Sequence, residues 1–223
     1  MLKTNVTIAL VALLALSVGQ AKATLLAYEG FDYTANTAVA DANGGTGWNA
    51  AWTASSTNGS QTVLSPTLSE GGVTGTGNRL SVSTVGATNS NAGRVIFSST
   101  TNSGTYWLSV MGSNGAGSGT TYGYLQLGDQ YGNVPVRIGY TNGGNWYVQS
   151  PNNGNAKTDT GIAATSALLV LKIDLTNKTL DLWVNPSSAS DTADASVGMS
   201  TTSNYVRFDR LSIRVGSSSS GTS

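Results

Sequence analysis

Apolar and polar positions alternate most regularly in the stretch Ala167–Pro186. Leu168–Leu175 and Thr179–Val184 both carry an apolar residue at every second position. A period of two places these apolar side chains on one face of a β-strand. Asn177 and Lys178 lie between the two runs and suit a tight turn. The pattern therefore predicts a β-hairpin that is apolar on one face and mixed on the other, and it favours a layered antiparallel β fold.

Shorter runs with similar character recur along the chain and are separated by turns rich in Gly and Asn. They predict strands at Leu25–Phe31, Gln61–Leu64, Arg79–Ser83, Arg94–Phe97, Thr105–Met111, Tyr122–Leu127, Val134–Tyr140, Trp146–Gln149 and Tyr205–Val215. Ser150–Thr160 is polar and is expected to be a connection. In the last strand the apolar parity shifts between Phe208 and Leu211, which predicts a β-bulge near Asp209. The whole is expected to be an all-β, two-sheet antiparallel β-sandwich of jelly-roll type, with a closed barrel as the alternative.

Residues 1–23 do not fit this pattern. A short positive start at Lys3 is followed by an uncharged apolar run, Val6–Val18, and then by Ala21-Lys22-Ala23. This order is typical of a secretory signal peptide cleaved after the second small residue. A membrane anchor needs roughly 20 apolar residues, and the run is shorter than that. We therefore predict a signal peptide over 1–23, one sandwich domain over 24–215 and a Ser/Gly-rich tail over 216–223, in a protein that is secreted or displayed at the cell surface without membrane insertion after cleavage.

Charge and composition exclude several functions. The chain has 11 basic and 11 acidic side chains, and cleavage would remove Lys3 and Lys22, leaving 9 basic against 11 acidic and a net charge near −2. Such a weak charge does not indicate nucleic acid or an anionic membrane as a partner. The chain has no cysteine and no histidine. Disulfides, histidine-dependent catalytic triads and His-ligated zinc are therefore excluded.

The order of several segments resembles exported laminin G-like (concanavalin A-like) domains of environmental bacteria. The resemblance spans nearly all of residues 25–215 and rests on strand motifs, which are LLAYEGFDY, GGTGW, NRLSVS, TYWLSVMG, YGYLQLGD, VRIGY, LVLKIDLTNKTLDLWVNP and FDRLSIR. It implies two large antiparallel sheets packed face to face, one of them concave. Some such proteins end in a cell-surface sorting signal. None follows Val215 here, so we expect either release or a sequence that stops before that signal.

Carboxylates are the first candidates for catalysis, because glycoside hydrolases occur on the implied fold. Such enzymes need two carboxyl groups roughly 5 to 10 Å apart. The two glutamates, Glu29 and Glu70, lie in separate segments. Asp174 and Asp181 could be neighbours across the hairpin, but a solvated strand face, with Asp174 beside a lysine, is the simpler interpretation. We therefore expect no catalytic function, and a hydrolase or lyase with an unfamiliar site remains an alternative.

The sequence favours calcium binding over catalysis. Asp41 and Asn43 offer side-chain oxygens in a Gly-rich turn, which is the chemistry that Ca²⁺ prefers. The alternative is ordinary turn chemistry, in which these side chains bond their own backbone. Glu29, Asp32 and Asp209 form a second candidate structural site, because first and last strands are often paired in such sandwiches.

Aromatic side chains near turns are candidates for sugar binding. Stacking on Trp or Tyr suits the C–H faces of a pyranose, while Asn takes hydroxyl groups. The strongest group is Trp146 and Tyr147 beside Asn142 and Asn145, and Trp48 and Tyr131 are further candidates. The alternative for all of them is packing inside the sheets. If the first interpretation holds, Trp146→Ala abolishes glycan retention and leaves the melting temperature nearly unchanged.

These observations favour an exported, non-catalytic, lectin-like module that binds polysaccharide or another cell-surface component. A structural or adhesive surface protein that acts through protein–protein contacts, including self-association, is the alternative. The sequence does not identify the ligand.

Overall fold

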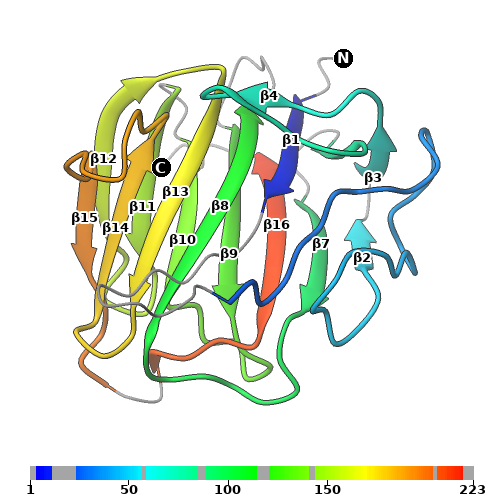
Figure 1. Ribbon diagram of the computed structural model, residues 1–223. Coiled ribbons are helices and arrows are strands. Elements are labelled where there is room, and N and C mark those ends of the chain that lie inside the picture. Colours follow the sequence, from blue (N-terminus) through cyan, green and yellow to red (C-terminus); the bar gives the residue numbers. More distant parts are fainter. Residues whose placement is uncertain are drawn as a thin grey trace, which may run out of the picture.

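Two seven-stranded antiparallel sheets lie face to face in a computed structural model of the chain (Figure 1). The structure describes residues 4–11, 24–56, 59–84, 89–114, 121–140, 144–202 and 205–217. The strands form two separate hydrogen-bonded sheets, as in a sandwich, whereas a closed barrel would join them in one continuous sheet. The all-β sandwich class is therefore confirmed.

The first sheet, here called the front sheet, contains the predicted hairpin. Its order is β15 (Ala195–Gly198), β14 (Thr179–Val184), β13 (Ser166–Asp174), β8 (Thr105–Asn114), β1 (Thr4–Val11), β6 (Arg79–Thr84) and β3 (Gly59–Leu64). β13 and β14 pair from Asp174 opposite Thr179 to Leu169 opposite Val184. Lys178 in the turn has a φ of 59°. The hairpin is confirmed at the predicted place.

The second sheet, the back sheet, covers the front sheet's inner face. Its order is β12 (Ala156–Ala163), β11 (Asn145–Ser150), β10 (Val136–Tyr140), β9 (Thr121–Gly128), β16 (Arg210–Ser217), β7 (Asn89–Val95) and β2 (Thr53–Ser56). A small separate pair joins β4 (Ser69–Glu70) to β5 (Val73–Thr74). At one edge the two sheets meet, where the Thr158 hydroxyl on β12 donates a 2.7 Å hydrogen bond to the Ser196 carbonyl on β15.

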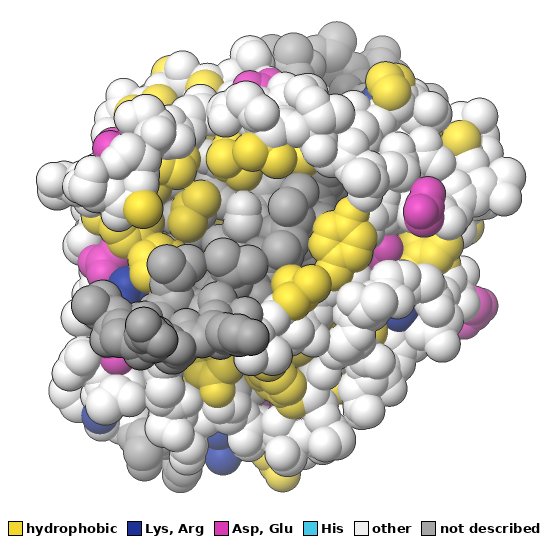
Figure 2. Space-filling view, in the orientation of Figure 1, with side chains coloured by type: hydrophobic (Ala, Val, Ile, Leu, Met, Phe, Trp, Pro, Cys, Tyr) yellow, Lys and Arg dark blue, Asp and Glu magenta, His cyan; other side chains and the backbone are white. Residues whose placement is uncertain are grey.

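The core lies between the sheets and takes apolar side chains from both. Leu80, Leu171 and Leu180 enter it from the front sheet, and Leu125 and Ile213 enter it from the back sheet, all of them fully buried. Full burial of one such side chain stabilises the fold by about 1.5–3 kcal/mol. Charged side chains are few and scattered over the outer face in view (Figure 2).

Three local predictions need revision. Leu25–Phe31 makes only an isolated bridge, Tyr28 with Thr46, and is not a strand of either sheet. Ser150–Thr160, expected to be a connection, contains most of β12; alternating half-exposed side chains at a sheet edge do not need to be apolar. The predicted irregularity at Asp209 is present, but the extra residue lies on the opposite segment. There the amides of Ile96 and Phe97 both donate to the Asp209 carbonyl, at 2.7 and 3.1 Å, so two residues face one.

The predicted signal peptide overlaps the described structure. Thr4–Val11 form β1, which lies between β6 and β8, and residues 12–23 fall outside the described ranges. Cleavage after Ala23 stays a prediction. Among the residues that the structure describes, no helix is long and apolar enough to cross a membrane. β16 continues through Gly216 to Ser217, so the predicted tail begins two residues inside a strand, and residues 218–223 are not described.

Candidate functional site

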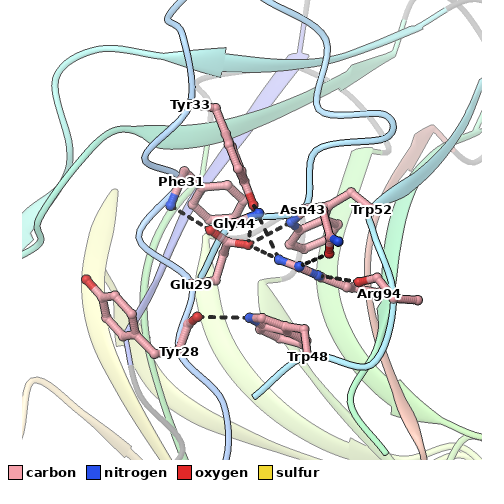
Figure 3. A network of polar contacts seen from close by, with 10 residues as sticks. Tyr28, Glu29, Phe31, Tyr33, Asn43, Gly44, Trp48, Trp52 and Arg94 are labelled. Carbon is pink, nitrogen blue, oxygen red and sulfur yellow. Dashed lines mark hydrogen bonds and ion pairs between the residues drawn. The ribbon is translucent and has the colours of Figure 1, made fainter. Parts of the chain in front are cut away.

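A buried ion pair joins Glu29, in the segment before β2, to Arg94 of β7 (Figure 3). The Glu29 carboxylate and the Arg94 guanidinium approach to 2.5 Å, between Oε2 and Nη1. Glu29 is 0% exposed and Arg94 is 3% exposed. Removing two charges from water is costly, and it is tolerated only where further hydrogen bonds complete both partners.

The carboxylate of Glu29 is completed by three more donors. The amide of Phe31 donates to Oε1 at 2.8 Å. The Tyr33 hydroxyl and the Trp52 indole N–H donate to Oε2 at 2.9 and 2.8 Å. Burial and the neighbouring Glu29 charge raise the pKa of Tyr33, so its hydroxyl keeps the proton that it donates. Glu29 is therefore a structural anchor, enclosed by donors, and is not free to act as a catalytic acid or base.

The guanidinium of Arg94 fixes the loop that precedes β2. Its Nε donates to the Ala50 carbonyl at 2.7 Å and its Nη2 donates to Oδ1 of Asn43 at 2.8 Å. The guanidinium carbon lies 5.0 Å from the centre of the Trp48 ring, a cation–π contact. The Trp48 indole N–H donates to the Tyr28 carbonyl at 2.9 Å. Trp48 is thus held from two sides.

This arrangement accounts for the predicted calcium ligands. Asn43 gives its side-chain oxygen to a guanidinium, and Asp41 is exposed at a φ of 65°, with its amide bonded to the Trp52 carbonyl. Within the described ranges, no three acidic or other metal-ligating side chains converge. Asn43 is therefore a partner of Arg94, and Asp41 occupies a turn position with positive φ. Calcium binding at these two residues stays a prediction. In the second candidate group Glu29 pairs with Arg94, and Asp209 bonds Arg210 at 2.7 Å.

An open pocket of about 690 Å³ lies beside Trp48. Three aromatic side chains, Trp48, Phe97 and Tyr106, contribute to its wall together with Ile96. The polar part is formed by Asn49 and the loop 98–102, which reads Ser-Ser-Thr-Thr-Asn. Among the described residues that line it, none carries a charge. The pocket therefore combines aromatic residues with uncharged residues that carry hydroxyl and amide groups.

The aromatic wall is held in place by packing beneath it. The rings of Phe97 and Tyr106 are 6.3 Å apart, and each packs on the buried Phe208 ring, at 5.9 and 5.4 Å. The Tyr106 hydroxyl is 2.7 Å from the Thr101 hydroxyl. At the other side Gly47 has a φ of 76°, and a Cβ there would lie 1.7 Å from the Leu26 carbonyl oxygen, so only glycine fits.

The structure does not assemble the predicted Trp146 group as an exposed platform. Trp146 is 3% exposed, belongs to the core, and packs edge-on against Tyr140 at 5.9 Å. Tyr147 is also buried, with the Lys157 ammonium 4.3 Å from its ring centre. Asn145 is half-buried at the start of β11, and Asn142 lies outside the described residues. Neither buried ring offers a free face for stacking, so Trp146 is a core residue.

Of the other predicted residues, Trp48 alone lines the pocket. Tyr131 is 67% exposed in the loop after β9, where the Arg207 guanidinium lies 4.8 Å from its ring centre. The sequence did not single out Asn49, Phe97, Tyr106 or the loop 98–102. An aromatic residue followed directly by five hydroxyl and amide side chains, as in Phe97–Asn102, was the available signal.

Asp174 and Asp181, considered as possible neighbours across the hairpin, do not lie opposite each other. Asp174 lies opposite Thr179, whereas Asp181 lies opposite Lys172 and its Oδ2 is 3.8 Å from the lysine Nζ. Asp174 is 6% exposed, contrary to the expected solvated face. Its two oxygens accept hydrogen bonds from the amide and the side chain of Asn177, at 2.8 and 2.9 Å. Asp174 therefore closes the hairpin turn.

Asp129 closes the loop beneath Tyr131 in a similar way. Its Oδ1 accepts the amides of Tyr131 and Asn133, and its Oδ2 accepts Nδ2 of Asn133 and Nε of Arg207. Burial raises the pKa of Asp129, but these hydrogen bonds outweigh it and the net pKa lies below the ordinary value. Asp174 behaves likewise: burial raises its pKa, and the bonds from Asn177 produce a net lowering.

The lowered pKa values predict a loss of stability in acid. A carboxyl whose pKa is lower in the folded state stabilises the fold above its unfolded pKa of about 3.9, and the contribution fades as the pH falls through the folded pKa. Urea unfolding from pH 6 to pH 2.5 is expected to show a falling free energy of unfolding below about pH 4. The double variant Asp129→Asn, Asp174→Asn is expected to lose less over the same range. An equal fall in the free energy of unfolding below pH 4 for the parent chain and the double variant would contradict this.

Comparison with models of protein families gives no match for the chain, and comparison with curated proteins gives none either.

Proposed function

We propose that the protein is an exported, non-catalytic, lectin-like module that binds a neutral polysaccharide in the pocket beside Trp48. One observation carries this proposal: the pocket joins three aromatic rings to a rim of Asn, Ser and Thr side chains, without a charge among its described lining residues. A sugar ring has C–H faces that stack on aromatic rings and hydroxyl groups that bond amides and hydroxyls. An uncharged site suits a neutral glycan.

The way the pocket is built supports binding. Trp48 is fixed by Arg94 and by the Tyr28 carbonyl, and Tyr106 is fixed by Phe208 and Thr101. Side chains that are already ordered lose little conformational freedom when a ligand binds. The resemblance to laminin G-like domains, which include lectins, agrees with this proposal.

The inventory of carboxylates favours binding over hydrolysis. A glycosidase needs two carboxyl groups at the scissile bond. The described lining of the pocket contains none, and the nearby Glu29 is enclosed by Arg94, Tyr33, Trp52 and a backbone amide.

The test is retention of the exported chain on a panel of insoluble and soluble polysaccharides, with calcium and with chelator. Asn49→Ala and Asn102→Ala remove exposed polar groups from the rim. Each is expected to weaken binding about 3- to 10-fold, the effect of one lost hydrogen bond, while leaving the melting temperature unchanged. Tyr131→Ala is the matched control, because this exposed aromatic lies outside the pocket lining.

Two outcomes would overturn the proposal. Retention that is indifferent to both rim variants would place the site elsewhere. No retention on any polysaccharide, together with concentration-dependent self-association in light scattering, would favour the structural or adhesive function.

A further inference from the structure

β1 is an interior strand of the front sheet (Figure 1). Residues Thr4–Ile8 pair with Leu80–Thr84 of β6, and residues Val6–Val11 pair with Ser109–Asn114 of β8. The same residues belong to the predicted signal peptide. Signal peptides are removed in the mature exported protein.

Without residues 1–23, two strands of the sheet each lose a neighbour. β6 keeps β3 as its partner, and β8 keeps β13. The facing edges of β6 and β8 then stand two strand spacings apart, roughly 9–10 Å. Both edges present unpaired backbone N–H and C=O groups, which form a template for another strand.

Direct closure of this slot is opposed by the rest of the fold. β6 and β8 are both antiparallel to β1, so they run parallel to each other. Direct pairing of β6 with β8 would therefore be parallel, whereas the hydrogen-bonded neighbours among the described strands are antiparallel. Closure would also move β6 by about one strand spacing, 4.7–4.9 Å. Leu80 and Val82 of β6 are fully buried in the core, and β6 packs on β16 and β7 of the back sheet.

The register defines the chemistry of a strand that would fill the slot. Positions 6, 8 and 10 lie opposite Val82, Leu80 and Val110, which all belong to the buried core. Positions 5 and 7 lie opposite Ser83 and Ser81. The occupant must therefore be extended, must run antiparallel to both neighbours, and must carry apolar residues at alternate positions over about eight residues, since successive side chains of a strand alternate between faces.

We propose that the slot between β6 and β8 of the exported chain receives such a strand from another polypeptide, in trans. This mode, addition of a strand to an open sheet, gains affinity from backbone hydrogen bonds and specificity from alternate side chains. A second copy of this chain is a poorer donor, because the other described strands already pair within their own sheets. The proposal rests on cleavage after Ala23 and is independent of the glycan pocket.

The test uses the chain as an expressing host exports and processes it, with the new N-terminus sequenced. The probe is a synthetic peptide with the sequence of Thr4–Val11, flanked by lysines for solubility. At a hundredfold excess over its Kd it is expected to bind one to one and raise the melting temperature by about 5–10 °C. Hydrogen exchange is expected to become slower at Leu80–Thr84 and Ser109–Asn114. The control peptide carries Ile8→Asp, which places a charge opposite Leu80, and is expected not to bind.

Several results would overturn the proposal. An exported chain that retains residues 1–23 removes its premise. A processed monomer whose β6 and β8 amides are already protected, with no effect of the peptide, would show that the slot is closed or filled from within, and a dimer in light scattering would identify a second copy as the occupant. If the processed chain is unfolded alone, the peptide is expected to restore the β-sheet signal in circular dichroism, and its failure to do so would also count against the slot.

Discussion

Arg94→Met is expected to destabilise the protein by about 3–5 kcal/mol, the typical cost of removing one partner of a buried ion pair. The variant leaves the Glu29 carboxylate buried without its countercharge and removes the cation–π contact to Trp48. It also frees Asn43 and the Ala50 carbonyl, which Arg94 holds at 2.8 and 2.7 Å. Urea unfolding measures the loss, and polysaccharide retention is expected to weaken with it.

Two further variants test whether the loss of stability comes from the buried Glu29–Arg94 pair and not from replacing any charged side chain. Lys172→Met breaks the 3.8 Å pair with Asp181, whose side chains are 32% and 23% exposed, and is expected to cost less than about 1 kcal/mol. The double variant Glu29→Gln, Arg94→Met removes both charges and is expected to cost less than the sum of the two single variants. Additive losses would show that the two residues act independently.

Trp146→Ala is expected to cost about 3–5 kcal/mol of stability, as large-to-small changes of a buried Trp do. Its ring fills the core between Tyr140 and the backbone of Gly112, where a Cβ would lie 3.1 Å from it. Below its lowered melting temperature the variant is expected to retain polysaccharide like the parent chain, because Trp146 does not line the pocket. This reverses the expectation drawn from its place beside a polar loop.

Trp146→Phe is the matched control for this second result. It keeps an aromatic ring and removes an indole N–H that has no hydrogen-bond partner among the described residues. Phenylalanine is expected to cost much less than alanine in thermal unfolding. A glycan-binding defect in either folded variant, with little change in melting temperature, would restore Trp146 as a ligand contact.

The sequence predicted those parts of the fold whose strands and turn lie within one short stretch of the chain. The hairpin of β13 and β14 is such a part, because its alternation and its turn lie within one short stretch. β12 was missed for the opposite reason. It is an edge strand with one exposed and one half-buried face, and neither face is fully buried, so its sequence, AKTDTGIA, carries no apolar stripe. A strand that pairs on one side only is specified by its neighbour as much as by its own residues.

The candidate site could be predicted only in part. Trp48 was identified, but the residues that complete the pocket come from 47–49 and 96–106 and meet only when both sheets are in place. Trp146 and Tyr147 could not be distinguished from exposed aromatics near a turn, although Val148 at the same parity as Trp146 was a sign that this face is buried. Glu29, one of two glutamates and set in an apolar segment, was a comparable sign of a buried charge.

The Glu29 anchor also orders the events by which the pocket forms. Its carboxylate joins Trp52 and Arg94, which follow it by 23 and 65 residues. In the proposed export from the N-terminus, Glu29 would emerge before Trp52 and Arg94, so its carboxylate would stay hydrated until β7 had emerged. Closing contacts of such sequence separation is slow compared with forming a helix or a hairpin. If the chain is exported as proposed, the pocket beside Trp48 therefore forms late in folding, only after β7 has crossed the membrane and Arg94 can pair with Glu29.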